Sequence, residues 1–334
     1  MLTKRKIALL YGGKSAEHEV SVNGYAYVKT LLEKNGDEVV SVYITDAGKW
    51  TAFNGDVFPI PKGTEKKGSL QTGADRVEID AAIPLLHGNG GESGEVQGLL
   101  AEAGIPYVGA DVITSAICLD KHYAKCVAQN LGIPVAKWVS FCKKTDTDTA
   151  LMLCKERIGF PMFIKPRRLG SSVGAYPARS ESEFRKCFSQ AMEQGSNLVI
   201  VEELLDKKRE LECAFYSALG TTVISPPGEV LIDGFYGYDE KYNKATITVT
   251  EADIPACVAE KIREYNERLA QVFSLRHLAR IDYFLTEKGL VFNEINTFPG
   301  FTENSLYPKL LSGMGIEPGA AIAAFVEDAV TRAL

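Results

Sequence analysis

The sequence predicts an α/β protein that begins with a parallel sheet carrying helices on its faces. Two observations predict this class: strand and helix signals alternate along the first third of the chain, and short apolar runs end at glycines or at a histidine-glycine pair. Such alternation is typical of parallel sheets. Ligands of these sheets bind at the carboxyl ends of the strands. Gly12-Gly13 and His87-Gly88 both fall there, so we expect a ligand site beside them.

The composition indicates a globular protein of several domains without a basic surface. A length of 334 residues suggests about two or three domains. Hydrophobic residues make up 46% and charged residues 24%, which excludes a disordered chain. The formal net charge of -6 argues against a nucleic-acid partner. No apolar run approaches the roughly 18 residues of a membrane span. The seven cysteines are irregularly spaced and predict neither a zinc site nor a disulfide framework.

The first third alternates between strands and helices. Ile7 to Tyr11 is an apolar strand ended by glycines, and Val20 to Lys34 is a helix because apolar residues recur on one side. The other elements predicted here are strands at Val39–Ile44 and Ala81–Leu86 and a helix at Glu95–Ala103. The stretch Pro59–Gly73 is rich in Lys, Gly and Thr, and we expect it to be an exposed excursion within the first domain.

The rest of the chain also alternates, with longer strands near its end. Predicted helices lie at Lys121–Leu131, Thr147–Arg157, Ser182–Glu193 and Pro255–Phe273, and from about Pro318 onward. Predicted strands lie at Trp138–Cys142, Pro161–Lys165, Leu198–Glu202, Leu211–Leu219, Ala279–Leu285 and Leu290–Ile295. The last two strands are joined by a turn at Glu287-Lys288-Gly289.

A lysine followed by a glycine-serine loop is a candidate phosphate site. Lys165 ends a strand, and Gly170-Ser171-Ser172-Val173-Gly174 follows it. Backbone N–H groups of such a loop can surround phosphate oxygens, and a lysine supplies a point charge beside them. A hairpin turn with a surface lysine explains the same residues equally well, so both interpretations stay open.

The most specific group is a set of oxygen donors on two neighbouring strands. Asp282 lies on one strand, and Glu294 and Asn296, two residues apart, face the same way on the next. If the strands pair through the turn, Asp282 shares that face. Such hard oxygen donors suit Mg²⁺. The alternative, a surface hairpin with solvated charges, is weakened because apolar neighbours such as Ile281 and Phe292 indicate a buried hairpin.

Three further features are ambiguous by themselves. The aromatic loop from Gly234 to Tyr242 is either a mobile flap over a site or a loop packed on the core. Glu17 and His87 each follow the end of a strand, where a capping or surface role is the simpler explanation.

Taken together, these segments resemble the D-alanine–D-alanine ligases of the ATP-grasp superfamily, nearly from end to end. The resembling segments, in family order, are Gly12–Ser21, His87–Gly98, Asp120-Lys121, Lys165–Gly174, Tyr236–Tyr242, Arg280-Ile281-Asp282 and Asn293–Gly300. The resemblance implies an ATP-grasp fold of three α/β domains. They would be a Rossmann-like substrate domain at 1–109, a lid domain at 110–202 and a catalytic, metal-binding domain at 203–334.

The resemblance implies an ATP-binding site made by the second and third domains. ATP would phosphorylate the carboxylate of a first D-alanine, and the amine of a second would displace phosphate. The residues implied for ATP are Lys121, Lys165 and Lys241 at the phosphates, Ser171 and Ser172 in the covering loop, and Glu202, Glu203, Leu205 and Glu210 at the adenine and ribose. Asp282, Glu294 and Asn296 would hold two Mg²⁺ ions, with Mn²⁺ as a substitute and K⁺ as a further requirement of some relatives.

The amino-acid side of the site is also implied by the resemblance. Glu17 would bind the ammonium group of the first D-alanine, and His87 would lie near it. Ser171, favoured over Ser172, and Tyr242 would link to Glu17 and close the lid. Arg280 and the backbone N–H of Gly300 would stabilise the tetrahedral intermediate. Two departures, Ser93 and Arg167-Arg168-Leu169, occupy positions where the family usually has an acidic residue.

The second substrate is the main open question. The segment Phe301–Pro308 begins like the vancomycin-resistance ligases, which use D-serine or D-lactate. Leu306 in this segment instead resembles the D-alanine type. The resemblance implies that Ser305 and Leu306 bind substrate. Tyr242 argues against the D-lactate branch. We therefore expect D-alanine and keep D-serine as the alternative. Another ATP-grasp carboxylate–amine ligase and an inactive ATP-binding module are the remaining hypotheses. A cytoplasmic homodimer is the family expectation.

Overall fold

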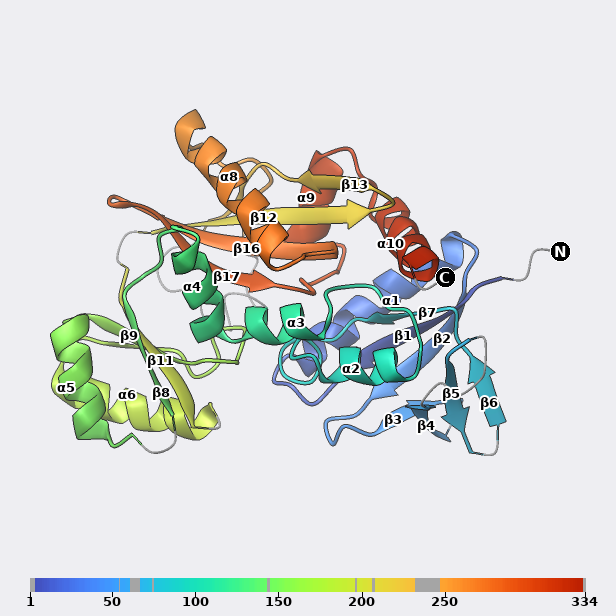
Figure 1. Cartoon of the computed structure of the whole chain (residues 1–334), viewed down its shortest axis with the longest axis horizontal. Coiled ribbons are helices and arrows are strands. Elements are labelled where there is room, and N and C mark those ends of the chain that lie inside the picture. Colours follow the sequence, from blue (N-terminus) through green and yellow to red (C-terminus); the bar gives the residue numbers. More distant parts are fainter. Residues whose placement is uncertain are drawn as a thin grey trace.

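The computed structural model describes residues 4–53, 55–60, 67–73, 75–142, 145–195, 197–205, 208–231 and 247–332. Its described strands form three sheets. Figure 1 shows the first and second sheets at opposite ends of the molecule, with the third sheet above and between them. The aromatic segment 234–242 lies outside the described residues.

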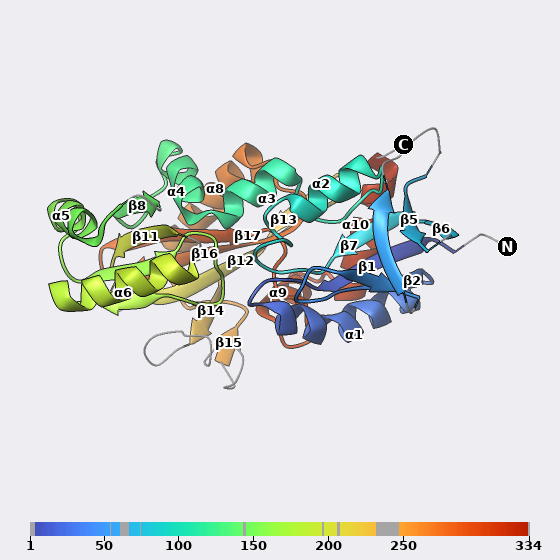
Figure 2. The same cartoon turned by 90° about the horizontal axis from the view of Figure 1, so that it is seen from below.

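The first sheet is mixed: the three predicted strands, β1, β2 and β7, are parallel as expected, whereas the strands from β2 to β6 pair antiparallel with their neighbours. Its order is β6-β5-β4-β3-β2-β1-β7, and β1 pairs in parallel with both β2 and β7. Helices α1 and α2 lie on opposite sides of it (Figure 2). The elements are β1 Lys6–Gly12, β2 Glu38–Ile44, β3 Trp50–Ala52, β4 Gly55–Ile60, β5 Ser69–Thr72, β6 Asp75–Glu78, β7 Ala81–Pro84, α1 His18–Lys34 and α2 Glu95–Glu102.

Alternate side chains of β1 explain why helices cover both faces. Leu9 packs in the cluster that includes Leu32 of α1, whereas Leu10 packs in the cluster that includes Leu100 of α2. A strand that is buried on both faces has a continuous run of apolar residues, and such a run, Ile7 to Tyr11, predicted β1 from the sequence.

The expected exposed excursion at Pro59–Gly73 is partly wrong. Within it, β4 and β5 pair with one another, and Leu70 is fully buried in the cluster on the α2 side. The Lys- and Gly-rich composition concealed these strands because they are short, lie toward one edge of the sheet and carry few apolar residues.

The second sheet is antiparallel, in the order β10-β9-β11-β8. Helices α5 and α6 pack on one face through Leu151, Phe184 and Phe188. Its elements are β8 Trp138–Cys142, β9 Met162–Pro166, β10 Tyr176–Ala178, β11 Leu198–Glu203, α5 Thr147–Arg157 and α6 Glu181–Gln194.

The third sheet confirms the predicted hairpin and carries helices on both faces. Strands β16 and β17 pair antiparallel, with Thr286 opposite Gly289 across the turn. The elements are β12 Arg209–Ala218, β13 Thr221–Ile224, β14 Gly228–Leu231, β15 Ile247–Val249, β16 His277–Thr286 and β17 Gly289–Asn296. Its helices are α3 Val112–Leu119, α4 Lys121–Asn130, α8 Ala256–Val272, α9 Leu306–Gly313 and α10 Pro318–Arg332.

One hydrophobic cluster packs α3 and α4 on the third sheet, and a second joins the third sheet to the first sheet. Cys118 and Ala124, from α3 and α4, pack with Ile281 and Phe292 on one face. Helices α9 and α10 share the other face with the first sheet. Among the described helices, none is long and apolar enough to cross a membrane alone, and only the pair α9 and α10, bent by 95°, passes such a test together. The division predicted at 109 and 202 stays a prediction; the boundary at 202 falls within β11, and α3 and α4 pack on the third sheet.

His277 links the first and third sheets through a buried network. Its Nδ1 accepts from the Gly109 N–H at 2.9 Å, so its Nε2 carries the proton toward Asp328, 3.2 Å away. Burial, reinforced by Arg276, lowers the pKa of His277 from 6.5 to about 4. Protonation would break the bond from Gly109, because a protonated ring nitrogen cannot accept.

This network predicts an acid-labile contribution to stability. Between pH 6.5 and about 4 the unfolded chain protonates His277 while the folded chain does not, so the free energy of unfolding should fall as pH falls. The fall attributable to this residue should be roughly 3 kcal/mol. His277→Asn, which tolerates the residue's positive φ of 60, should flatten that part of the curve in urea titrations at several pH values. An unchanged pH dependence in the variant would contradict the assignment.

Candidate active site

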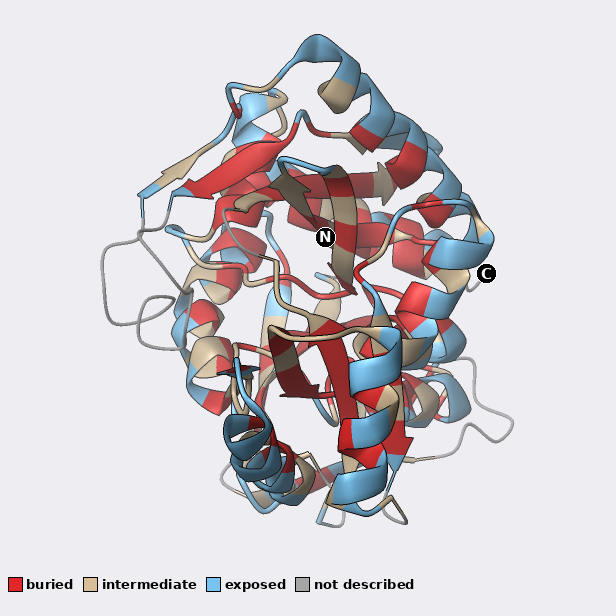
Figure 3. Ribbon diagram, turned by 90° about the vertical axis from the view of Figure 1, so that its left-hand side faces the viewer, coloured by how far each residue is buried: buried red, intermediate tan, exposed pale blue. Residues whose placement is uncertain are grey.

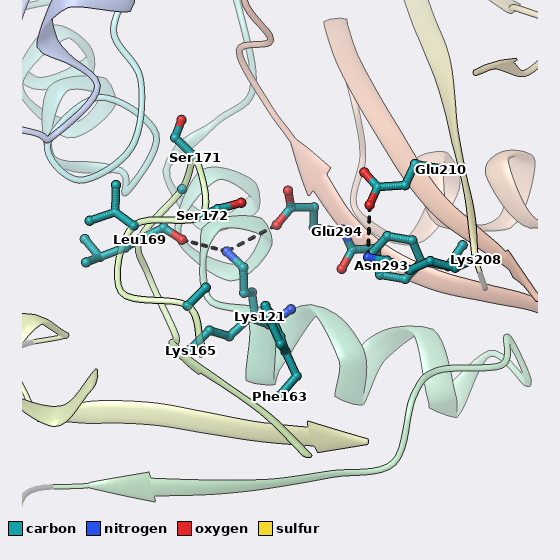
Figure 4. Close-up of a pocket in the computed structure, with 14 residues that line it drawn as sticks. Lys121, Phe163, Lys165, Leu169, Ser171, Ser172, Lys208, Glu210, Asn293 and Glu294 are labelled. Atoms are coloured by element: carbon teal, nitrogen blue, oxygen red, sulfur yellow. Dashed lines mark hydrogen bonds and ion pairs between the residues drawn. The ribbon is translucent and has the colours of Figure 1, made fainter. Parts of the chain in front are cut away.

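A pocket opens between the second and third sheets, and most of the predicted nucleotide residues line it (Figure 4). One wall is the glycine-serine loop after β9, and the opposite wall comes from β12, β16 and β17. The lining residues used below are Lys121, Phe163, Lys165, Ser171, Ser172, Lys208, Glu210, Phe284, Asn293 and Glu294.

The glycine-serine loop reaches across to the first sheet. The Ser171 hydroxyl donates a hydrogen bond to the carboxylate of Glu17, although the two residues are 154 positions apart. Ser171 and Ser172 have φ values of 52 and 57, a left-handed conformation that is costly for non-glycine residues and clusters at ligand clamps. The predicted contact between loop and first sheet is therefore made by Ser171 in this structure.

Two glycines enclose the Glu17 carboxylate. A Cβ added at Gly170 would lie 2.5 Å from Glu17 Oε2, and one added at Gly88 would lie 2.8 Å from the same atom. Either added carbon would be closer than real Cβ contacts allow. The position of Glu17 thus depends on the absence of side chains in the two loops beside it.

Lys121 and Lys165 place two cations at the pocket. Lys121 Nζ lies 3.2 Å from Glu294 Oε2 and donates to the Leu169 carbonyl at 2.9 Å (Figure 4). Burial opposes the charge on Lys121, but Glu294 outweighs it, and the pKa of Lys121 is raised. Lys165 Nζ lies 3.0 Å from Glu202 Oε2. The ammonium group of Lys121 therefore remains charged, and the two lysines together suit an anion such as a polyphosphate.

The predicted acidic group lies on one face of the β16–β17 hairpin. Asp282 is directly opposite Glu294, and Arg280 is directly opposite Asn296. Arg280 donates from Nε and Nη2 to both oxygens of Asp282, at 2.8 and 2.7 Å. Burial opposes the charge of Arg280, but Asp282 and Glu212 raise its pKa further. The Asn296 amide donates to Asp282 at 3.0 Å.

These donors fit a magnesium ion only together with ligands from a substrate. In the described part of the chain, no three His, Cys, Asp or Glu residues gather closely enough to form a complete metal site. Two carboxylates and an amide do share one face, however, and Mg²⁺ commonly binds through one or two carboxylates plus phosphates and water. The ladder shifts register between Asp282 and Tyr283, a bulge of the kind found beside active sites.

His87 and Glu92 connect the first sheet to the segment after β17. His87 Nδ1 donates to the Phe298 carbonyl at 3.0 Å, and its Nε2 is buried without a hydrogen-bond partner in the described structure. Glu92 accepts from the backbone N–H groups of Gly88 and Phe298, at 3.0 and 2.9 Å. Burial, reinforced by Glu17, raises the pKa of Glu92 to about 7. These hydrogen bonds hold the loop after β7 against the segment after β17.

Of the four residues predicted at the adenine and ribose, Glu210 lines this pocket, at the end away from Ser171 (Figure 4). Lys208 pairs with Glu210 at 2.9 Å, and its ammonium lies 3.7 Å from the centre of the Phe284 ring. Phe163 and Phe284 provide flat apolar walls that the sequence interpretation missed. The sequence spacing could have identified both rings. Phe163 is two residues from Lys165 on β9, and Phe284 is two residues from Asp282 on β16, so each shares a strand face with a predicted site residue.

The comparisons with known proteins decide the family. A family described as "D-ala D-ala ligase N-terminus" matches residues 6–110, and one described as "D-ala D-ala ligase C-terminus" matches residues 127–327. The chain belongs to the D-alanine–D-alanine ligase family. The predicted resemblance is therefore confirmed, and so is the ATP-grasp fold.

Relatives of this ligase family match along almost the whole chain. A D-alanine–D-alanine ligase of Caldicellulosiruptor bescii is 33% identical, with 99% of this chain and 96% of the relative covered. The solved structure of D-alanyl-alanine synthetase A from Vibrio cholerae matches with a TM-score of 0.88 at 33% identity, covering 99% of this chain and 100% of that one. VanG D-Ala:D-Ser ligase from Enterococcus faecalis matches with a TM-score of 0.85 at 29% identity, covering 98% and 100%.

Of the remaining predicted site residues, Gly300 and Ser305 lie in the loop before α9, Leu306 begins α9, and two others lie outside the described residues. Ser305 exchanges hydrogen bonds with Thr302, and its Oγ would be 3.3 Å from a Cβ added at Gly300. Leu306 is buried in the cluster shared by the first and third sheets. Lys241 and Tyr242 fall in the segment that is not described, so their predicted roles stay predictions.

Proposed function

We propose that this chain uses ATP to join two D-alanines into D-alanyl-D-alanine for peptidoglycan synthesis. The observation that carries the proposal is the bond from Ser171 to Glu17, because it brings the loop over the candidate phosphate site onto the candidate ammonium site. Membership of the ligase family supports the same activity.

In the first step, a carboxylate oxygen of D-alanine attacks the γ-phosphorus of ATP and ADP leaves. Lys121 and Lys165 hold the phosphates, with Lys241 as a third proposed contact. Glu17 holds the ammonium group of this D-alanine, and Ser171 with Tyr242 closes the site. Excluding water here protects the acyl phosphate from hydrolysis.

In the second step, the amine of the second D-alanine attacks the acyl carbon. A tetrahedral intermediate forms, and phosphate leaves with the former carboxylate oxygen. Arg280 and the backbone N–H of Gly300 stabilise the oxyanion, because fixed donors act most strongly where charge develops. His87 lies beside the first substrate, and Ser305 and Leu306 contact the second.

Asp282, Glu294 and Asn296 are the proposed ligands for Mg²⁺, with Mn²⁺ able to replace it and K⁺ as a possible addition. When bound, the divalent ion neutralises phosphate charge during transfer. The fit rests on the shared face of the two carboxylates described above.

Glu202, Glu203, Leu205 and Glu210 form the proposed adenine and ribose site, with Ser172 in the cover. Glu202 is buried and lies 3.2 Å from Lys125 through its Oε1 and 3.0 Å from Lys165 through its Oε2. The pocket encloses about 80 Å³. The bond from Ser171 to Glu17 closes the pocket on the side of the first sheet, and we propose that this loop moves away from Glu17 to admit ATP.

D-Serine is the second candidate for the second substrate. The structural similarity to VanG D-Ala:D-Ser ligase favours keeping it. Leu306 favours D-alanine, although an apolar pocket rejects an added hydroxyl only by roughly a hundredfold.

A product assay separates these functions. The chain is incubated with ATP, Mg²⁺ and equal D-alanine and D-serine, and the dipeptides are identified by mass. We expect D-alanyl-D-alanine to predominate. Predominant D-alanyl-D-serine would reassign the second substrate, and ATP binding without D-alanine-dependent phosphate release would contradict the ligase activity.

We also propose a cytoplasmic homodimer without nucleic-acid or membrane partners. All seven cysteines are free, which supports a reducing compartment, although Cys126, Cys142 and Cys257 are exposed.

A further inference from the structure

Two buried lysines share one carboxylate behind the candidate ATP pocket. Lys125 Nζ of α4 lies 3.2 Å from Glu202 Oε1, and Lys165 Nζ of β9 lies 3.0 Å from Glu202 Oε2. Lys125 is only 1% exposed and Glu202 only 4%. Burial alone would raise the pKa of Glu202, but the two lysines lower it to about 2. The carboxylate of Glu202 is therefore held ionised between two lysine side chains away from water, and burial lowers the pKa of Lys125.

The two lysines differ in what they can reach. Lys165 lines the pocket beside Ser171 and Ser172, whereas Lys125 does not line it. Within the described residues, the one ion pair of Lys125 is with Glu202. Lys125 also lies one helical turn after Lys121, so both project from the same face of α4.

Because only Lys165 reaches the pocket, the two lysines behave differently when Lys165 turns toward a phosphate. Glu202 would then lose one of its two partners while still buried, and an unpaired buried carboxylate is costly. Lys125 supplies a partner that the ligand does not compete for. Without Lys125, Glu202 would have Lys165 as its remaining counter-ion and would hold it back from the pocket.

We propose that Lys125 is a positioning residue that pairs with Glu202 and thereby releases Lys165 to bind the phosphates of ATP. The inference rests on the proposed function, in which Lys165 is a phosphate ligand. It adds a residue that acts through Glu202 and Lys165 and does not touch the nucleotide.

The test compares ATP with adenosine, which has the same base and ribose but no phosphate. Dissociation constants for both are measured by calorimetry, without D-alanine, for the wild type and Lys125→Met. The ratio of the adenosine constant to the ATP constant reports the contribution of the phosphates. We expect this ratio to fall about tenfold or more in the variant, since one charge-assisted contact is weakened. The affinity for adenosine should change by less than about threefold.

The double variant Lys125→Met/Glu202→Gln is the matched control. It removes the buried charges as a pair, which protects folding. It also leaves Lys165 without the carboxylate that would retain it. A change at the proposed adenine site affects ATP and adenosine alike and cancels in the ratio, so the ratio, and not either affinity, should return to within about threefold of the wild type. Thermal unfolding of both variants checks that each is folded.

Other outcomes overturn the inference. Equal losses of ATP and adenosine affinity in Lys125→Met would indicate a general structural role, and an unchanged ratio would indicate no role. A ratio that stays low in the double variant would show that Lys125 does not act through Glu202, and this result would overturn the inference even if Lys125→Met does not fold. A wild type that binds no ATP would instead contradict the proposed function itself.

Discussion

Replacing Arg280 with methionine is expected to lower kcat by roughly a hundredfold to a thousandfold, the cost of removing one oxyanion-stabilising donor. The guanidinium is fixed by both oxygens of Asp282 and by Glu212, 3.1 Å from its Nε. A donor held in this way costs no reorganisation when charge develops on the tetrahedral intermediate. Steady-state kinetics with D-alanine and ATP measure the effect.

Arg280→Lys is the control for charge. It keeps a cation beside Asp282 but loses the planar fork, so most of the loss in kcat should remain. The ATP dissociation constant should change by less than about threefold in both variants, because the proposed role concerns the transition state. A loss confined to ATP binding, with kcat preserved, would assign Arg280 to the nucleotide instead.

Replacing Gly170 with alanine is expected to reduce kcat/KM for D-alanine by roughly a hundredfold, the effect of about 1 Å of misplacement at a reacting centre. The added Cβ would lie 2.5 Å from Glu17 Oε2, so either the loop or the carboxylate must shift. The bond from Ser171 to Glu17 would then be lost together with closure of the loop.

Gly55→Ala is the matched control, because an added Cβ there has nothing within 4 Å. It should leave kcat/KM within about twofold of the wild type. Activity of Gly170→Ala equal to that of this control would show that loop closure onto Glu17 does not limit the reaction.

The sequence predicted most elements that are buried on both faces or strongly periodic. The strands β1, β9, β11, β16 and β17 follow continuous apolar or alternating runs, and the structure confirms them. Strands β3 to β6 were missed because they are short and lie toward one edge of the sheet. Helices α3 and α9, each of 8 residues, were also missed, whereas the equally short α2 was predicted because Gly104 and Pro106 mark its end.

The candidate site could be predicted from the sequence where a single strand or loop carries several of its oxygen ligands. The spacing of Glu294 and Asn296 and the turn before them placed both opposite β16, and the ladder confirms that register. Contacts between distant segments, such as Glu202 with Lys125, could not be derived, because they depend on how α4 packs against the second sheet. The family resemblance supplied roles for individual residues but assigned none to Lys125.

The most direct test of the central claim is to follow the carboxylate oxygens of D-alanine. With D-alanine labelled by ¹⁸O in its carboxylate, the account predicts that each phosphate released carries one ¹⁸O atom, because the oxygen that attacked ATP leaves with the phosphate. The dipeptide should retain one label in its peptide carbonyl. Unlabelled phosphate, or label appearing in AMP, would contradict an acyl phosphate pathway and with it the proposed roles of Lys165 and Arg280.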